Sequence, residues 1–463
     1  MATQNEPQAD ALAWASLAAT HREAQDMPQA LAAFERAAAC APDYAEWRFR
    51  IAQTRFEMGL DSADLFGQLR RSAPQNLMIV AAEASALAAE RHTDRAIACL
   101  DAALVQHPDW IEGHKSLAAI RLAAGEPKSE FARSFAPAIS AKPANLALRL
   151  ASFHIAALTK QWDMAQSIVA DGEAVIGSRS AFTLARLFVA CETHDDAQAR
   201  ALFAQTSDLT DAGLELCRVR FGLRTGDFAM AETAALRLLQ TPASANAWPY
   251  LSLLWRSRGD ARAQWLDAPD VLVKSFDLDF TRDEIDQLAL TLRRLHAARA
   301  PQLEQSVRGG SQTERQLFFR TEPIIQTVRA KILAAVGDYV SALPPVDLRH
   351  PLLGARRDAL RFAGSWSVRL RGAGYHVAHT HPMGWISSAL YVALPAPDEM
   401  GAPPAGWIGF GAPPPELGLN LPPYHQVEPK VGRLVLFPST MWHATEPFVE
   451  GERLVIAFDM ARC

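Results

Sequence analysis

The sequence lacks a cysteine pair at the CxxC spacing, and no apolar run in it is long enough to cross a membrane. Its five cysteines are scattered: Cys40, Cys99, Cys191, Cys217 and Cys463. A cysteine-based active site is therefore not indicated, and the cysteines are expected to be small buried residues in a reducing compartment. The first residues also lack the basic start and apolar core of a secretory signal. These absences predict a cytoplasmic protein without a membrane segment.

The chain has little excess charge of either sign. Its 463 residues include 46 Lys and Arg against 51 Asp and Glu, a net charge of −5. Neither nucleic acid nor an anionic membrane is therefore predicted as a partner. Hydrophobic residues form 49% and charged residues 21% of the sequence, which is typical of a globular protein. The length exceeds one ordinary core, so two or three domains are expected.

Residues 1–260 have few runs of β-branched residues and are rich in Ala and Leu, with apolar residues at the three- and four-residue spacing of α-helices. A longer period overlies this spacing. Pro42, Pro74, Pro108 and Pro143 follow one another at intervals of 32, 34 and 35 residues. Each proline follows an alanine-rich segment and ends it, because proline cannot continue the helical hydrogen-bond ladder.

The first of these units resembles a tetratricopeptide repeat. The positions that match its spacing are Trp14, Leu17, Ala30, Phe34, Ala37 and Pro42. The resemblance implies an array of roughly seven units of about 34 residues each. A generic stack of helical hairpins is the alternative. Either arrangement is an α-helical solenoid, whose concave surface typically binds a peptide or a partner protein that the sequence does not identify.

From residue 261 onward the pattern becomes mixed. Two amphipathic helices are expected over 283–300 and 321–343, with a polar loop, SVRGGSQTERQ, between them. After Pro351, short β-branched and aromatic segments bounded by Gly or Pro predict strands. These strands cover 365–371, 374–381, 385–394, 406–411, 432–439 and 453–460. We therefore predict two domains, helical repeats over 1–260 and a strand domain with flanking helices over 261–463, whose β core covers about 362–460.

Three histidines fall within six residues just ahead of the apolar segment 385–394. Because side chains alternate faces along a strand, His379 and His381 should share a face and His376 should point the other way. At about 3.3 Å per residue, His379 and His381 would lie roughly 7 Å apart, so both can bind one metal ion. The best third ligand is His443, which follows another apolar segment.

The order of these residues resembles the Fe(II)/2-oxoglutarate-dependent oxygenases. His379 opens an HxHP motif, a segment with SxxYV follows, and His443 closes LVLFPS…WH, ten residues before Arg453. The pattern is most similar to the prolyl-4-hydroxylase-like branch, and within it to a group of bacterial and phage 2OG-Fe(II) oxygenases. The resemblance covers about the last hundred residues. It implies a double-stranded β-helix (jelly-roll or cupin-like) with a mononuclear Fe(II), 2-oxoglutarate as co-substrate and O2.

The resemblance also assigns roles to residues. His379, His381 and His443 match the metal ligands, and Arg453 matches the residue that binds the far carboxylate of 2-oxoglutarate. A guanidinium suits that task because it holds a carboxylate through two parallel, charge-assisted hydrogen bonds. Tyr391 matches a position whose hydroxyl often donates to the same carboxylate. Ser388 and Thr445 are further candidates for lining the co-substrate site.

One position departs from the family pattern, because His381 stands where the family has an acidic ligand. The usual set is two histidines and one carboxylate. A three-histidine iron site is one interpretation, and a carboxylate from elsewhere, such as Asp459, is another. A fold that has lost catalysis is a third. Three histidines also suit a hydrolytic zinc site, but that interpretation leaves Arg453 unexplained and finds no obvious acidic base.

The sequence thus predicts a dioxygenase that hydroxylates a C–H bond, with the repeats recruiting a protein or peptide whose side chain is the substrate. The first alternative is an oxygenase of a small molecule in which the repeats serve assembly. The second is a scaffold protein with a degenerate oxygenase fold. The substrate, the position of hydroxylation and the oligomeric state do not follow from the sequence.

Overall fold

The computed structural model describes residues 6–296, 305–354 and 356–462. Its contacts divide these residues into two compact units. The first holds the described residues up to 142 together with 313–329, and the second holds 143–296, 305–312 and the described residues from 330 onward. Within the described ranges, no helix combines the length and apolar character that a membrane crossing requires.

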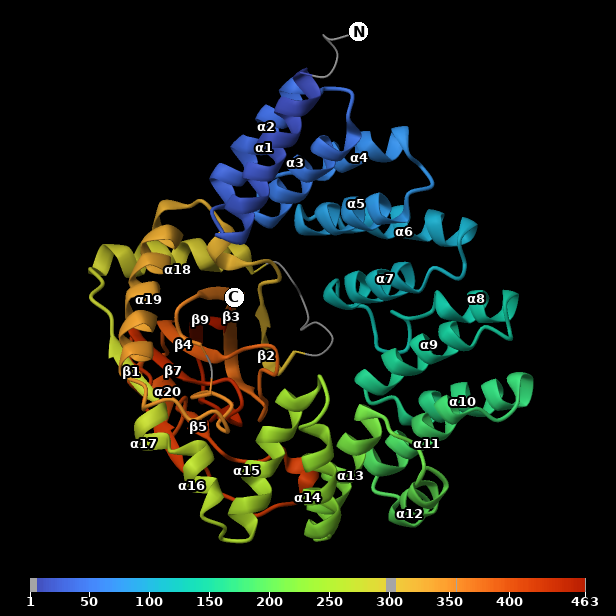
Figure 1. The fold of residues 1–463 in the computed structure, drawn as a ribbon, viewed down its shortest axis with the longest axis vertical. Coiled ribbons are helices and arrows are strands. Elements are labelled where there is room, and N and C mark those ends of the chain that lie inside the picture. Colours follow the sequence, from blue (N-terminus) through green and yellow to red (C-terminus); the bar gives the residue numbers. More distant parts are fainter. Residues whose placement is uncertain (1–5, 297–304, 355, 463) are drawn as a thin grey trace. The chain divides into compact units, whose positions relative to one another are not determined.

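The first unit contains four consecutive helix pairs (Figure 1). They are α1 (Glu6–Glu23), α2 (Met27–Cys40), α3 (Ala45–Glu57), α4 (Ala63–Ser72), α5 (Leu77–Ala89), α6 (Thr93–Gln106), α7 (Ile111–Ala123) and α8 (Phe135–Ala141). Side chains cap some of the helix starts, as Asn76 does by accepting from the backbone N–H of Met78 at 3.1 Å. Fully buried alanines such as Ala30 and Ala37 let neighbouring helices approach closely.

The second unit continues with three further helix pairs and several shorter helices. The pairs are α9 (Leu146–Leu158), α10 (Trp162–Ile176), α11 (Ser180–Glu192), α12 (Asp196–Gln205), α13 (Ala212–Thr225) and α14 (Phe228–Leu238). After them come α15 (Ala247–Ser257), α16 (Arg262–Asp267), α17 (Pro269–Leu272), α18 (Arg282–Leu295), α19 (Pro323–Ser341), which spans both units, and α20 (Pro397–Met400). The expected series of helix pairs is confirmed, and α18 and α19 correspond to the two predicted amphipathic helices.

Among the described residues, Cys191 and Cys217 lie together in one buried cluster and interact through a side-chain hydrogen bond. Cys191 and Cys217 are buried and free, and Cys40 and Cys99 are half-buried and free. The prediction of small buried residues therefore holds for Cys191 and Cys217 and only in part for Cys40 and Cys99. Cys463 lies outside the described residues.

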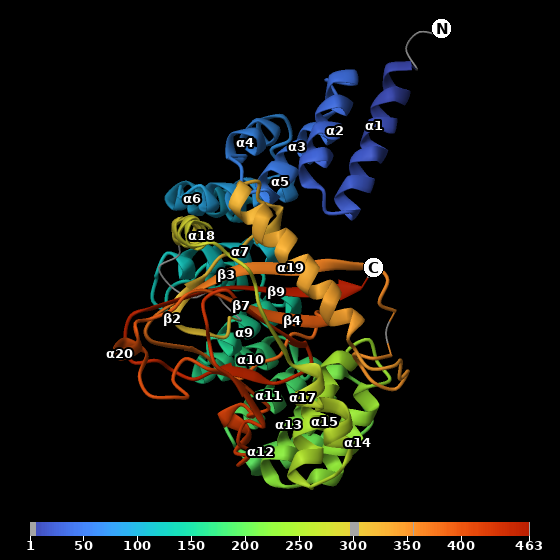
Figure 2. The same cartoon turned by 90° about the vertical axis from the view of Figure 1, so that its left-hand side faces the viewer.

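The strands form two antiparallel sheets, and Figure 2 shows strands of the larger one. The larger has the order β1-β7-β4-β9-β3-β2 and the smaller the order β6-β5-β8. The strands are β1 (Lys274–Asp277), β2 (Val307–Gln312), β3 (Leu360–His376), β4 (Ile386–Ala393), β5 (Ile408–Phe410), β6 (His425–Val427), β7 (Arg433–Pro438), β8 (His443–Thr445) and β9 (Glu452–Arg462). Helices followed by antiparallel strands confirm the predicted fold class; the double-stranded β-helix stays a prediction.

Two expectations about the strands are wrong. The polar segment SVRGGSQTERQ is not only a loop, because Val307–Gln312 pairs antiparallel with β3. Gly310 allows this pairing, since a Cβ there would collide with the backbone of Arg369. The predicted strand over 374–381 ends at His376 as part of the long β3, so His379 and His381 lie beyond its end.

Helix α15 and the strand region pack together within the second unit. The indole N–H of Trp442 donates to the carbonyl of Pro249 at 2.9 Å, and the Trp442 ring lies 5.4 Å from that of Tyr250. The guanidinium of Arg256 donates to the carbonyl of Pro422 at 2.8 Å. The boundary expected between residues 260 and 261 therefore falls inside this compact unit.

Candidate metal centre

The backbone brings His379 and His443 face to face. The N–H of each residue donates to the carbonyl of the other, at 3.1 Å in both directions. The N–H of His381 donates to the carbonyl of Ser439 at 3.0 Å. The segment after β3 thus runs antiparallel to the segment from Ser439 to the first residue of β8. This pairing explains how histidines far apart in the sequence meet.

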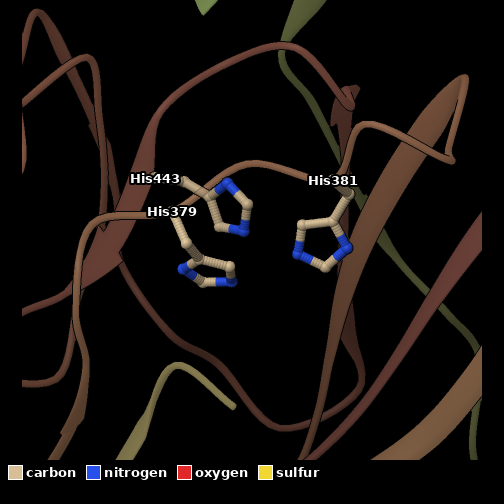
Figure 3. A group of neighbouring side chains, drawn as sticks. All are labelled: His379, His381 and His443. Atoms are coloured by element: carbon tan, nitrogen blue, oxygen red, sulfur yellow. The ribbon is translucent and has the colours of Figure 1, made fainter. Parts of the chain in front are cut away.

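The three imidazole rings converge on one point (Figure 3). Their metal-binding nitrogens all lie within 4.8 Å of one another. The ring of His379 is 4.2 Å from that of His443 and 5.0 Å from that of His381, centroid to centroid. In the part of the chain that the structure describes, this is the one cluster of His, Cys, Asp or Glu with such geometry.

Hydrogen bonds fix which nitrogen of each ring faces that point. Nδ1 of His379 lies 2.8 Å from the carbonyl oxygen of Val377, and Nδ1 of His443 lies 3.0 Å from that of Met441. A carbonyl oxygen only accepts, so both Nδ1 atoms carry the proton and both Nε2 atoms are unprotonated, each with a lone pair that can accept a hydrogen bond or bind a metal ion. Nδ1 of His381 lies 2.7 Å from a carboxylate oxygen of Asp459. Anchoring of this kind is typical of metal-binding histidines.

Desolvation keeps His379 and His443 neutral. It lowers the pKa of His379 to about 3, with the neighbouring His381 adding to the effect. Burial and the adjacent imidazoles also hold the pKa of His443 well below its usual range. A neutral imidazole is the form that binds a metal ion, so near neutral pH His379 and His443 need lose no proton first.

His376 does not point away from the site, as strand alternation predicted; it lines the same cavity. Regular strand geometry ends at His376, so the alternation does not extend to His379. Nδ1 of His376 lies 2.9 Å from Oγ of Ser306, and that Oγ lies 3.2 Å from Nε2 of His379. Because His379 Nδ1 carries the proton, the Ser306 hydroxyl donates to Nε2. Ser306 therefore lies beside the point on which the rings converge, and no sequence motif marked it.

Arg453 enters the cavity from β9 as a buried cation. It is 2% exposed, and its Nε and Nη1 atoms have no hydrogen-bond partner among the described residues. Its guanidinium carbon lies 5.0 Å from the centre of the Tyr391 ring. Burial lowers the pKa of Arg453 from its usual value. Burying a charge without an oppositely charged partner costs roughly several kcal/mol. An anionic ligand beside Arg453 would offset that cost, so the site fits such a ligand.

Tyr391 lies beside Arg453 in the interior, and burial raises the pKa of its hydroxyl. The Arg453 guanidinium acts on the pKa of that hydroxyl in the opposite direction, through its charge and a side-chain hydrogen bond. The ring lies against the guanidinium and Tyr391 is not among the residues that line the cavity. The structure thus places it where it can hold Arg453 in position.

A cavity of about 530 Å³ joins the histidines and Arg453. Ser388, Thr445 and Asp459 line it as well, and so does Leu158 at the end of α9. The Ser388 hydroxyl donates to the carbonyl of Phe458 and accepts from its N–H, both at 2.9 Å, so it ties β4 to β9. The helical half therefore contributes a wall residue, Leu158, that its repeat pattern did not single out.

The sequence of the strand region matches a known family model. Residues 364–459 match the family described as "Putative 2OG-Fe(II) oxygenase", which confirms the predicted resemblance. No curated protein matches the chain.

Several solved structures are similar to parts of the chain. A viral collagen prolyl hydroxylase from Paramecium Bursaria Chlorella virus-1 shares 14% identity, with a TM-score of 0.29, over 42% of this chain and 97% of its own. A Pseudomonas putida prolyl-4-hydroxylase shares 18% identity, with a TM-score of 0.27, over 41% and 92%. A tetratricopeptide repeat protein from Parabacteroides merdae shares 12% identity, with a TM-score of 0.35, over 53% and 98%.

Proposed function

We propose that this chain, with its oxygenase-family segment over residues 364–459, is an Fe(II)- and 2-oxoglutarate-dependent dioxygenase that hydroxylates a protein or peptide side chain. One observation carries the proposal. Three imidazoles, those of buried His443 and half-buried His379 and His381, converge in the same cavity as a buried guanidinium whose Nε and Nη1 have no partner among the described residues. A metal and a carboxylate are the two groups that such a cavity is built to receive.

The residues fit the metal. His379, His381 and His443 would hold Fe(II) through Nε2, since their Nδ1 atoms are engaged elsewhere. When bound, Fe(II) and 2-oxoglutarate supply the oxidising chemistry that inserts one oxygen atom of O2 into a C–H bond. The protein's part is to orient the three rings and to keep that chemistry away from bulk water.

The residues also fit the co-substrate. The Arg453 guanidinium can pair with the carboxylate of 2-oxoglutarate that is remote from the metal, and Tyr391 holds the guanidinium in place. Thr445 lines the cavity, and Ser388 contributes to its wall between β4 and β9. A hydrolytic zinc site has no use for a buried arginine in this position, so Arg453 favours the oxygenase over the zinc alternative.

A chain-like substrate is supported by a second cavity. It measures about 580 Å³ and shares Pro382 and Met383 with the metal cavity. Met383 is 86% exposed, so an extended peptide could cross it and occupy both spaces. Trp248 and Trp385 line the second cavity, and Leu158 brings the helical half to the first. We therefore propose that the repeats help position a cytoplasmic protein substrate; a small-molecule substrate remains the alternative.

Turnover measurements test the enzymatic proposal. Protein purified without oxygen, then given Fe(II), 2-oxoglutarate and O2, should convert 2-oxoglutarate to succinate. His443→Ala should abolish the conversion, whereas His425→Ala, on β6 and outside the cavity lining, should not. A wild-type chain that binds Fe(II) but forms no succinate, with or without cell extract as a source of substrate, would contradict the proposal.

A further inference from the structure

Asp459 is a buried carboxylate with both oxygens engaged. It lies on β9 directly opposite Ser387 of β4 and is 7% exposed. Its Oδ2 lies 2.7 Å from Nδ1 of His381, and its Oδ1 accepts from the Ser387 hydroxyl at 2.6 Å. The Ser387 hydroxyl also lies 2.8 Å from that of Ser439. The serines therefore fix the carboxylate, and among the described residues its one ion-pair partner is His381.

His381 is held on two sides. Its ring stacks on Trp366 with 5.6 Å between centroids and 13° between planes, while Nδ1 faces Asp459. Its buried Nε2 has no hydrogen-bond partner within the described chain. Asp459 itself is not part of the cluster whose ligand atoms converge. The carboxylate thus lies one imidazole away from the metal position.

We infer that Asp459 supplies, through His381, the negative charge that a three-histidine ligand set lacks. A carboxylate that accepts from the far nitrogen of a ligating imidazole fixes its tautomer and makes its Nε2 a stronger donor. The usual iron set obtains its charge from a carboxylate ligand. Here the pair His381–Asp459 takes the place of that ligand. Its negative charge lies on Asp459, which is separated from the metal position by the imidazole ring of His381. Asp459 is a positioning residue, and the inference rests on the proposed metal-binding function.

Relocating the charge tests this inference without relying on turnover. The probe is Co(II), titrated into metal-free full-length protein and followed by its visible ligand-field spectrum. Asp459→Asn keeps the shape of the side chain but removes the charge. It should weaken Co(II) binding about 10- to 100-fold, in line with the effect of removing an outer partner of a metal ligand, and alter the spectrum. The double variant Asp459→Asn/His381→Asp puts a carboxylate back in the ligand position and should recover most of the affinity.

A second buried carboxylate is the matched control. Asp267, 5% exposed and accepting from Ser252 at 2.7 Å, lies in the same unit but outside the lining of the cavity. Asp267→Asn should leave Co(II) binding unchanged. Unfolding midpoints of all metal-free variants show whether each is folded.

The outcomes separate this inference from the function on which it rests. Wild-type Co(II) affinity in folded Asp459→Asn would overturn the role of Asp459 and leave the metal site intact. A folded double variant that binds Co(II) as weakly as Asp459→Asn would likewise overturn that role. A wild-type chain that binds no Co(II) would overturn the metal site and the role of Asp459 together.

Discussion

His379 and His443 exchange two backbone hydrogen bonds of 3.1 Å, which places two of the three proposed ligands opposite each other in adjacent segments. The main chain thus holds the two rings close together, with 4.2 Å between their centroids. A site arranged in this way loses little conformational freedom when a cation enters.

Metal binding should therefore stabilise the folded chain. A ligand at 100 times its dissociation constant adds about 2.7 kcal/mol to the free energy of unfolding. Adding Fe(II) or Co(II) without oxygen should raise the thermal unfolding midpoint, and a chelator should reverse the rise. His443→Ala should remove the shift, and His425→Ala should retain it. A shift that survives in His443→Ala would place the metal elsewhere.

Replacing Arg453 should weaken the binding of 2-oxoglutarate and leave the binding of the metal unchanged. A hydrogen bond to a charged group contributes about 1.5–3 kcal/mol, so Arg453→Met should weaken 2-oxoglutarate binding by roughly 10- to 100-fold. Since this change also removes an unpaired buried charge, the metal-free variant should be at least as stable as the wild type. Isothermal titration and thermal unfolding check both parts. A strongly destabilised Arg453→Met would instead point to a structural role for the guanidinium.

Leu158 should affect the substrate more than the co-substrate. Leu158→Ser alters the wall that α9 contributes to the metal cavity. Conversion of 2-oxoglutarate without added substrate should be unchanged, while hydroxylation of proteins in a cell extract, counted by mass spectrometry, should fall several-fold. Val175→Ser, at an exposed position on α10, is the control. Equal loss of both activities in Leu158→Ser would argue against a role in substrate positioning.

His296 should make stability depend on pH. Its nitrogens lie 2.9 Å from the Ser311 hydroxyl and 3.1 Å from the Ser367 hydroxyl. Burial, with help from Arg369, lowers its pKa to about 4. A lowered pKa means that the folded state resists protonation. Its stabilising contribution is therefore complete above the unfolded pKa of about 6.5 and is lost as pH falls toward 4.

The size of that effect can be isolated by substitution. The loss amounts to at most roughly 3 kcal/mol between pH 6.5 and pH 4. The unfolding midpoint of metal-free wild type should fall more steeply over this range than that of His296→Asn. The exposed His92→Gln should follow the wild type. Parallel curves for wild type and His296→Asn would show that the folded state protonates His296 as readily as the unfolded chain.

Local patterns in the sequence predicted most of the elements and the residues of the candidate site. Regularly spaced prolines after alanine-rich segments marked the helix pairs, and the HxHP and WH motifs marked the three histidines. Both kinds of pattern involve residues that are close together in the sequence, so they can be recognised without the structure. The partners of Asp459 and Ser306 depend on which strands pair and where β3 ends, so no local pattern could place them. The pairing of Val307–Gln312 with β3 was missed because glycine and polar residues rarely form strands unless a partner supplies the register.

The most direct test of the proposed oxygenase is a sequential titration under anaerobic conditions, first with Fe(II) and then with 2-oxoglutarate, followed by calorimetry. We predict one Fe(II) per chain and binding of 2-oxoglutarate to the metal-loaded protein. That binding should be lost in His443→Ala and weakened in Arg453→Met. Absence of 2-oxoglutarate binding to the Fe(II)-loaded wild type, or binding that neither variant changes, would contradict the proposed function.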